Sequence, residues 1–414
     1  MESDQAGAVL PRAAARALEA AMRVTPAVVL LGARQTGKTT LVRSLPALAA
    51  RPYLTLDELG VRLQAEADPE ALVARAPSLV LDEVPRAKDL LIAVKRAVDR
   101  DRPRRPGRFV LTGSANLLML ERIGESLAGR ASYVTLWPFT RRELLGAGAT
   151  GPWSALVAAR APEWRDVLGR EDARPVDWRE AVHRGGFPVP ARELADPEAR
   201  ARWFAGYAQT YLERDLPMLR AVENLGDFRR FMQAACLRVG GLLNQAELGR
   251  DVGLSQPQVH RFLNVLEASF LAVRLQTYAV NSTKRLIKAP KLYWCDTALA
   301  LHLAEETTPR PAHLENLVLM DLLAWRDLQA KRPQVLYWRT AAGEEVDFVI
   351  ETGRRLLPIE VKSVERVLPA HARGLESFLD EYADRSDGGL LLHAGTETFP
   401  LTRRVLAAPW WRVL

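Results

Sequence analysis

A phosphate-binding loop near the N-terminus constrains this chain more than any other feature. Residues 32–39 read GARQTGKT and match the pattern G-x-x-x-x-G-K-[ST], in which glycines let backbone N–H groups face a phosphate. The apolar run 27–31 before the loop predicts a buried strand, and residues 40–45 after it predict a helix. Because a strand–loop–helix context distinguishes such a loop from a chance match, we expect an α/β fold that binds a nucleotide.

An acidic pair follows the next apolar run. Residues 78–81 predict a parallel strand, and Asp82 and Glu83 stand where that strand ends. Asp82 is expected to hold Mg²⁺ together with the hydroxyl of Thr39, and Glu83 to orient or deprotonate the attacking water. The alternative is an apolar strand that ends in a solvated acidic turn.

A third strand, residues 108–112, also ends in polar residues. Thr112, Ser114 and Asn116 can each sense a γ-phosphate from such a strand tip, and the sequence does not choose among them. A helix over 89–98 separates this strand from the previous one, which predicts a parallel sheet covered on both faces. With ATP and Mg²⁺ as the expected cofactors and Lys38 reaching the β- and γ-phosphates, the predicted nucleotide-binding residues are Gly32, Ala33, Arg34, Gln35, Thr36, Gly37, Lys38, Thr39, Thr40 and Ser114.

Arg130 is a candidate for charge stabilisation during hydrolysis. It follows Ser126–Gly129 and precedes a predicted strand at 133–136. An arginine finger spreads the transition-state charge of the γ-phosphate, either in the same chain or in a neighbouring subunit. From spacing alone, an ordinary surface arginine is an equal alternative.

Residues from about 10 to 145 resemble an AAA-type ATPase of a widespread bacterial and archaeal family. The resemblance rests on the loop at 32–39 and on four further segments, which are Leu81–Glu83, Leu111–Ser114, Leu127–Arg130 and Trp137–Leu144. It implies ATP hydrolysis, with Lys38, Glu83 and Arg130 as catalytic residues. Members of this family carry a C-terminal domain of unassigned function, and the resemblance extends over nearly the whole chain.

Composition narrows the class of protein. A chain of 414 residues is too long for one ordinary core and predicts two or three domains. The net charge of +7 permits nucleic-acid binding, although the excess of arginine and alanine is equally explained by a GC-rich genome. Only Cys236 and Cys295 are present, which excludes a disulfide framework. No apolar run approaches the roughly 18–20 residues that cross a bilayer, and residues 1–4 lack a signal-peptide pattern, so we expect a cytoplasmic protein without a membrane partner.

The middle of the chain predicts a DNA-binding module. Residues 244–252 and 256–268 predict two helices around a short turn, as in a winged helix, with the second as the recognition helix. Gln258 and Arg261 on that helix are expected to face a DNA groove. A wing over 279–291 follows, with four cations that suit phosphate contacts, namely Lys284, Arg285, Lys288 and Lys291. The alternative is a helix-turn-helix that serves only protein interaction or structure.

The last hundred residues contain a second candidate active site. Glu360 and Lys362 stand two apart on a predicted strand, so their side chains face the same side, and Asp347 lies on the neighbouring predicted strand. Two carboxylates can share a divalent metal while a lysine steadies the attacking water. The pattern resembles the restriction-endonuclease-like fold, which implies Glu315, Asp347 and Glu360 as metal ligands and Asp347, Glu360 and Lys362 as catalytic residues. Alternatively, Asp347 pairs with Lys362 as a structural salt bridge in an inactive fold.

Together these patterns predict an α/β protein in four parts. They are an AAA-type P-loop ATPase domain (1–145), a helical connector (146–240), a winged helix (241–305) and a restriction-endonuclease-like domain (306–414). The expected function is Mg²⁺-dependent ATP hydrolysis coupled to DNA binding or processing. Two alternatives stay open: an ATP-gated, metal-dependent nuclease, and a nucleotide-dependent signalling or defence switch that binds a protein partner. A homo-oligomer is compatible with all three.

Overall fold

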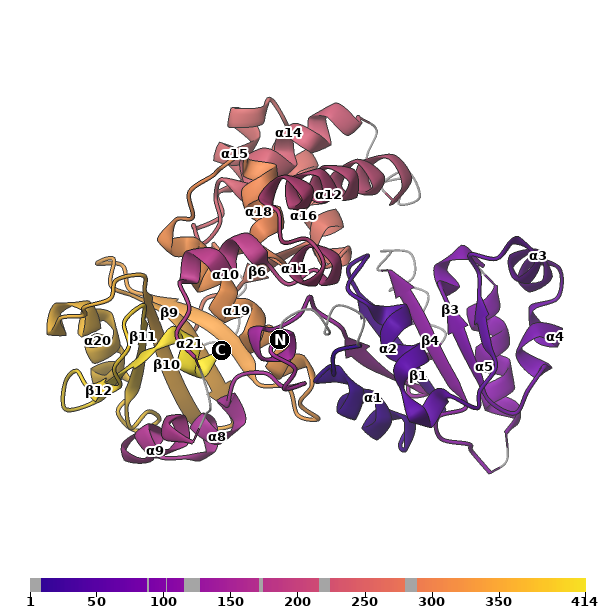
Figure 1. Ribbon diagram of the computed structural model, residues 1–414, viewed down its shortest axis with the longest axis horizontal. Helices are drawn as coiled ribbons and strands as arrows, with labels where there is room; N and C mark the ends of the chain where they lie inside the picture. The colour runs from indigo at the N-terminus through magenta and orange to yellow at the C-terminus, as the bar shows by residue number, and fades with distance from the viewer. Residues whose placement is uncertain are drawn as a thin grey trace.

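The chain folds into three regions in a computed structural model (Figure 1). The structure describes residues 9–87, 89–101, 103–114, 127–170, 174–215, 224–279 and 289–414. We call residues 9–145 the N-terminal region and residues 174–310 the middle region. The C-terminal region comprises residues 311–414 together with residues 146–170, because the shorter segment packs against the longer one.

The N-terminal region is built on a five-stranded parallel sheet in the order β2-β3-β4-β1-β5. The strands are β1 (Ala27–Gly32), β2 (Tyr53–Thr55), β3 (Leu79–Asp82), β4 (Phe109–Ser114) and β5 (Ala131–Thr135). The helices before and between them are α1 (Ala14–Met22), α2 (Lys38–Ser44), η1 (Pro46–Leu48), α3 (Leu59–Ala67), α4 (Pro69–Ala74), η2 (Val84–Arg86) and α5 (Leu90–Arg100). The predicted parallel α/β fold is confirmed.

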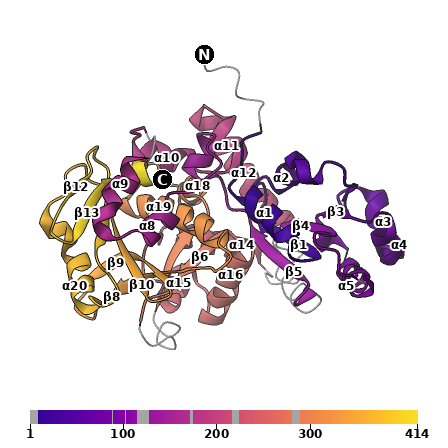
Figure 2. The ribbon, with the colours of Figure 1, turned by 90° about the horizontal axis from the view of Figure 1, so that it is seen from below.

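Both faces of this sheet are covered because β1 is apolar at every position. Val29 and Leu31 belong to a core shared with α4 and α5, whereas Val28 and Leu30 belong to one shared with α1 and α2. Alternate residues of a strand point to opposite faces, so an uninterrupted apolar strand requires cover on both sides. Figure 2 shows α2 and α5 on opposite sides of the strands.

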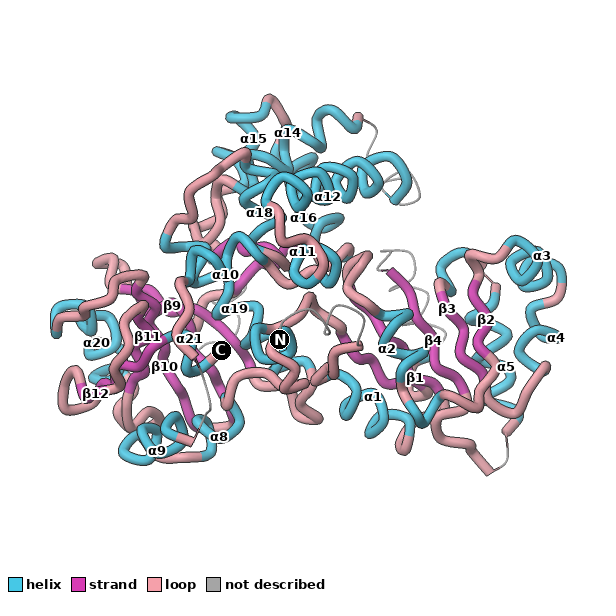
Figure 3. Tube along the Cα trace, in the orientation of Figure 1, coloured by secondary structure: helices cyan, strands magenta, loops and turns pink. Residues whose placement is uncertain are grey.

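The middle region is almost entirely helical, whereas strands gather in the two outer regions (Figure 3). It contains α10 (Trp178–Arg184), α11 (Pro188–Arg192), α12 (Pro197–Thr210), η4 (Tyr211–Asp215), α14 (Leu225–Cys236), α15 (Gln245–Val252), α16 (Gln256–Ala268), β6 (Ala272–Leu275), β7 (Lys291–Trp294) and α18 (Thr297–Ala304). Helices α15 and α16 begin and end close to the predicted residues. Strands β6 and β7 pair antiparallel, with Ala272 opposite Trp294.

The C-terminal region is a six-stranded mixed sheet in the order β12-β13-β11-β10-β9-β8. Its strands are β8 (Gln334–Arg339), β9 (Glu345–Thr352), β10 (Arg355–Lys362), β11 (Gly389–His393), β12 (Phe399–Pro400) and β13 (Val405–Pro409). Its other elements are α8 (Trp153–Ala158), η3 (Ala161–Glu163), α9 (Trp164–Gly169), α19 (Pro311–Asp327), η5 (Pro369–Ala372), α20 (Arg373–Glu381) and α21 (Trp410–Val413). The helix α7 (Arg141–Leu144) leads into it from the N-terminal region.

The middle and C-terminal regions share one hydrophobic core, which runs through α14, α16, α18, α19 and the inner face of the sheet. Thr277 forms a bridge with Tyr337 of β8, so the strand pair β6–β7 also lies against the edge of the C-terminal sheet. In contrast, the two sheet-covering cores of the N-terminal region are separate clusters. None of the helices in the described part of the chain has the length and apolar character that a bilayer crossing requires.

Candidate functional site

The phosphate-binding loop connects β1 to α2 at the carboxyl edge of the parallel sheet. Gly32 has φ +155°, and a Cβ at this position would lie 2.2 Å from the carbonyl oxygen of Leu136. Gly37 has φ +91° and directly precedes α2. Glycine is therefore required at both positions, once by a close backbone approach and once by left-handed backbone.

Lys38 lies along the inside of this loop. Its ammonium group donates to the carbonyl oxygens of Gly32 (3.1 Å) and Ala33 (2.8 Å), and its side chain is buried. Ala33 and Thr36 are buried with it, whereas Arg34 is half-buried. Gln35, Thr39 and Thr40 are exposed, which leaves the first turn of α2 accessible to a ligand.

Asp82 at the end of β3 is surrounded by hydroxyl groups. The Thr39 hydroxyl lies 3.3 Å from both carboxylate oxygens, and Thr112 of β4 donates to the same carboxylate. Tyr53 of β2 donates to it at 2.5 Å, and burial together with the Asp82 hydrogen bond and charge raises the pKa of Tyr53. A buried carboxylate beside a threonine hydroxyl is a donor set that fits Mg²⁺. No sequence pattern indicates Tyr53, because β2 is only three residues long.

Glu83 is held at the tip of β3 in left-handed backbone, with φ +53°. Such strain in a residue other than glycine concentrates at functional sites. The Ser114 hydroxyl lies 3.3 Å from the Glu83 carboxylate, and the Glu83 N–H donates to the Thr112 hydroxyl at 3.3 Å. Of the three strand-tip candidates, Thr112 thus contacts Asp82 and Ser114 contacts Glu83, while Asn116 lies outside the described residues.

Arg130 is not near the loop, which corrects the hypothesis that it acts within its own chain. It immediately precedes β5, and its carbonyl accepts a hydrogen bond from Ala27 N at the start of β1. Since β1 and β5 are parallel, Arg130 lies at the amino edge of the sheet, a full strand away from Gly32. Its guanidinium group pairs with Asp99 of α5 at 2.6 Å.

Arg12 is a buried residue of this site that the sequence pattern did not reveal. Its guanidinium group donates to the carbonyl oxygens of Thr36 (2.9 Å) and Trp137 (2.6 Å) and pairs with Glu143 (3.2 Å). Glu143 also accepts from two backbone N–H groups, those of Ala13 (2.7 Å) and Thr140 (2.9 Å). Arg12 thus ties the loop to the segment that leaves the N-terminal region, and only the fold brings these residues together.

The middle region reaches the same loop. A Cβ on Gly37 would lie 3.8 Å from Pro188 at the start of α11. The turn before Pro188 is held by Asp296, which accepts from the N–H groups of Gly186 (2.6 Å) and Phe187 (3.2 Å). Burial raises the pKa of Asp296 although these N–H groups stabilise its charge. The second glycine of the loop therefore lies beside an element that is anchored just beyond β7.

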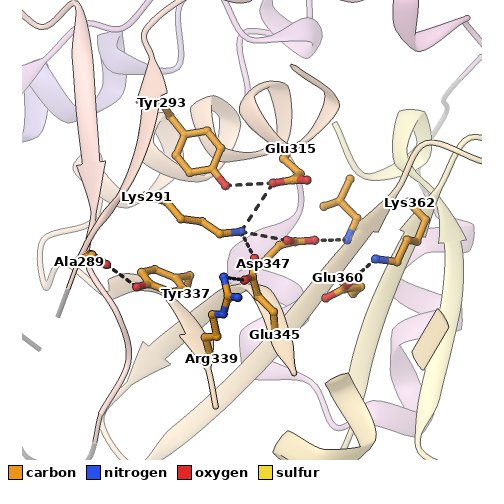
Figure 4. A network of polar contacts seen from close by, with 11 residues as sticks. Ala289, Lys291, Tyr293, Glu315, Tyr337, Arg339, Glu345, Asp347, Glu360 and Lys362 are labelled. Atoms are coloured by element: carbon orange, nitrogen blue, oxygen red, sulfur yellow. Dashed lines mark hydrogen bonds and ion pairs between the residues drawn. The ribbon is translucent and has the colours of Figure 1, made fainter. Parts of the chain in front are cut away.

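The second candidate site lies between α19, β9 and β10 in the C-terminal region, where the predicted residues do meet (Figure 4). Glu360 and Lys362 on β10 pair with each other at 2.5 Å. Asp347 on β9 accepts from Val361 N at 2.9 Å, and Glu315 on α19 accepts from the Tyr293 hydroxyl at 3.1 Å. We call Glu315, Glu345, Asp347 and Glu360 the acidic cluster.

Lys291 occupies this cluster, which corrects its prediction as a phosphate contact on a DNA-binding wing. Its ammonium nitrogen lies 3.3 Å from Asp347 and 3.8 Å from Glu315, and it also pairs with Glu345. Only 3% of Lys291 is exposed. Burial alone lowers the pKa of Lys291, but the three carboxylates together raise it above its ordinary value. The other predicted wing residues, Lys284, Arg285 and Lys288, lie outside the described residues.

The same lysine lies between two of the three predicted metal ligands, Glu315 and Asp347, and the role of these two and Glu360 in metal binding stays a prediction. In the described part of the chain, no group of three or more His, Cys, Asp or Glu side chains is arranged to hold a metal ion. Burial and then the charge of Asp347 raise the pKa of Glu315 to about 8 and that of Glu360 well above its ordinary value. One buried oxygen of Glu360 has no hydrogen-bond partner among the described residues. The cations that contact these acids are the ammonium groups of Lys291 and Lys362.

The two predicted DNA-contacting residues on α16 have different surroundings. The Gln258 carbonyl accepts from the N–H (3.0 Å) and the hydroxyl (2.8 Å) of Ser255, so this side chain caps its own helix. These hydrogen bonds hold it against the turn. Its contact with DNA stays a prediction. Arg261 is exposed on the outer face of α16.

Comparisons with known proteins match the chain in three segments. Residues 24–145 match a family described as AAA domain, and residues 176–310 and 311–413 match two domains of unknown function, DUF8612 and DUF4143. Two uncharacterized proteins, from Mycobacterium tuberculosis and Mycobacterium bovis, are each 32% identical over 97% of this chain and 84% of their own length.

Two solved structures are more distant. A Walker-type ATPase of Pyrococcus abyssi is 18% identical, covers 72% of this chain and 99% of its own, and has a TM-score of 0.41. The Thermotoga maritima RuvB protein is also 18% identical, covers 63% of this chain and 86% of its own, and has a TM-score of 0.27. Because these TM-scores are low, the family assignment rests on the sequence matches.

Proposed function

Because the chain belongs to the family of AAA-type P-loop ATPases with a C-terminal DUF4143 domain, we propose that it hydrolyses ATP in a Mg²⁺-dependent reaction coupled to DNA binding. The observation that carries the proposal is the approach of Thr39 to Asp82, within 3.3 Å, beside a loop that contains the buried Lys38. These three side chains come from two segments far apart in the sequence. Their convergence is what phosphate and metal binding requires.

Each residue has a separate role in this proposal. Lys38 leaves the loop carbonyls to bind the β- and γ-phosphates, and Thr39 and Asp82 hold the metal. Bound there, Mg²⁺ would neutralise charge that develops on the phosphate oxygens. Glu83 orients the attacking water, and Ser114, which lies 3.3 Å from it, fixes the direction of its carboxylate.

We place the DNA contact on α16 and the strands that follow it, as a winged helix. The buried face of α16, with Val259, Phe262 and Leu263, packs on the core, which leaves His260 and Arg261 exposed on the other face. Arg261→Ala combined with Lys284→Ala is expected to weaken DNA binding and to flatten its salt dependence, because each phosphate contact contributes to that slope. Arg202→Ala, an exposed arginine of α12, is the matched control. Unchanged binding by the double variant would reject the DNA surface.

The central test is ATP hydrolysis with and without single- and double-stranded DNA, with Lys38→Ala as the blank. We expect the wild-type chain to hydrolyse ATP, DNA to stimulate it, and Lys38→Ala to lose turnover while it stays folded. Hydrolysis that persists in Lys38→Ala would contradict the proposed site. Hydrolysis that is indifferent to DNA would favour the switch that binds a protein partner.

A metal-dependent nuclease in a restriction-endonuclease-like C-terminal domain is the second candidate. The juxtaposition of Asp347, Glu360 and Lys362 favours it, and the position of Lys291 within the acidic cluster opposes it. Labelled DNA incubated with Mg²⁺ or Mn²⁺, with Asp347→Ala in parallel, decides between the two. Absence of cleavage, or cleavage that survives Asp347→Ala, would reject the nuclease.

A further inference from the structure

We infer that Lys291 is the built-in cation of the C-terminal acidic cluster. The cluster therefore binds β7 of the middle region at the position where the sequence pattern predicts a divalent metal ion. This inference does not depend on ATP hydrolysis. It concerns a lysine and a group of acids that come from different regions of the fold (Figure 4).

The first argument is the position of the charge. The Lys291 ammonium lies between carboxylates of β9 and α19, 3.3 Å from Asp347 and 3.8 Å from Glu315, and it is 3% exposed. Buried carboxylates are costly unless a positive charge or a proton compensates them. Lys362, the other ammonium nearby, already pairs with Glu360 at 2.5 Å. Lys291 therefore supplies the charge that balances Asp347.

The second argument is that β7 is docked along its length. Side chains at alternate positions of a strand face the same side. Tyr293, two residues after Lys291 on β7, donates its hydroxyl to Glu315 at 3.1 Å. Just before β7, the backbone carbonyl of Ala289 accepts from the Tyr337 hydroxyl at 2.5 Å. The ammonium is thus delivered by a fixed strand.

The end of β7 is fixed in the same way. The side-chain amide of Asn316 on α19 accepts from Trp294 N at 2.8 Å and donates to Trp294 O at 2.7 Å. Asn316 directly follows Glu315, so one turn of α19 contacts both the lysine and the strand backbone. The docked strand and the neutralised cluster are parts of one interface.

It follows that a divalent ion and the lysine exclude each other. An ion ligated by Asp347 and Glu315 would lie within contact distance of the ammonium, and two cations at that separation repel in a buried site. Metal binding would require Lys291 to withdraw, which would break the β7 contacts. The wild-type cluster is therefore expected to bind its own chain in preference to a metal.

The test measures thermal unfolding of the nucleotide-free, full-length chain with and without millimolar Mn²⁺. Wild type and Asp347→Asn are expected to show the same Mn²⁺ shift, because any metal at the N-terminal loop is common to both. Lys291→Met, which keeps the side-chain length and removes the charge, is expected to unfold at least about 5 °C below the exposed-lysine control Lys331→Met. Mn²⁺ is expected to raise the midpoint of Lys291→Met, and addition of Asp347→Asn to abolish that gain.

Three results would overturn the inference. They are a Mn²⁺ shift in wild type that depends on Asp347, a Lys291→Met variant as stable as Lys331→Met, and a folded Lys291→Met variant without an Asp347-dependent Mn²⁺ gain. If Lys291→Met does not fold, Lys291→Arg keeps the charge and is expected to fold. The comparison of wild type with Asp347→Asn then decides, since it needs no change at Lys291.

Discussion

Asp82 and Asp347 are two buried acids on strands of two different sheets, 4% and 6% exposed, and they have opposite surroundings. Hydroxyl groups of Thr39, Tyr53 and Thr112 surround Asp82. An ammonium group from Lys291 lies beside Asp347. Burial is nearly the same in the two places, so the neighbours decide what each carboxylate can do.

The difference is one of net charge. Hydroxyl donors stabilise an ionised carboxylate but leave its negative charge uncancelled, so a cation can still be attracted to Asp82. The fixed ammonium of Lys291 cancels the charge of Asp347 and holds β7 against the acidic cluster. One site is thus suited to a cation that comes and goes, and the other to a permanent contact within the chain.

The largest expected effect separates the two sites by chemistry. Glu83→Gln should lower ATP hydrolysis by about 10²–10⁴-fold, because the amide cannot accept a proton from water, while nucleotide binding persists. Glu360→Gln should leave hydrolysis unchanged, since the C-terminal cluster takes no part in it. Steady-state phosphate release together with nucleotide binding by fluorescence checks both variants. Equal losses in the two variants would show that the sites do not act separately.

A second prediction sharpens the comparison, because the N-terminal region also contains a buried ion pair. Arg12 and Glu143 lie 3.2 Å apart, but they build the frame of the loop and do not fill it. Arg12→Ala should lower the free energy of unfolding by about 3–5 kcal/mol, since it leaves Glu143 buried without its cation. Urea denaturation measures this, with the exposed Arg16→Ala of α1 as control. A loss no larger than that of the control would mean that the pair contributes little.

Asp321 on α19 is an intermediate case, a buried acid whose hydrogen-bond donors are neutral. It accepts from Trp153 (2.5 Å) and from Gly151 N (2.8 Å), and burial raises its pKa from 3.8 to about 6. A raised pKa in the folded state means that Asp321 contributes stability below pH 3.8, and that this contribution is lost as the pH rises through 6. The free energy of unfolding of Asp321→Asn should therefore increase by about 3 kcal/mol relative to that of wild type as the pH rises from 4 to 7.

Denaturation of both proteins across that pH range gives the measurement. The difference between the two curves isolates Asp321 from the other carboxylates that titrate there. A difference that does not change with pH would show that Asp321 stays ionised, and that neutral donors suffice to hold a buried charge in this fold.

The sequence is most informative where the functional residues are neighbours in the chain. The loop at 32–39, the pair Asp82-Glu83 and the strand residues Glu360 and Lys362 were all predicted, because local periodicity places each on its element. For Lys291 the sequence indicates the wrong partner, because its neighbours in sequence are cations, whereas its neighbours in space come from β9 and α19. Arg12 and Tyr53 were missed for the same reason, since their contacts join segments that only the fold brings together.

The smallest expected effect concerns Arg130, at the sheet edge opposite the loop. Arg130→Ala removes an exposed pair with Asp99, and such pairs contribute about 0–1 kcal/mol, so stability and hydrolysis by a single chain should barely change. An arginine finger, in contrast, accounts for about 10³–10⁵-fold in rate. Hydrolysis measured over a range of protein concentrations distinguishes the two roles. A large loss that appears only at concentrations where the wild type assembles would mean that Arg130 serves a neighbouring subunit, and that the nucleotide site takes a cationic side chain from outside the chain, as the acidic cluster takes one from within it.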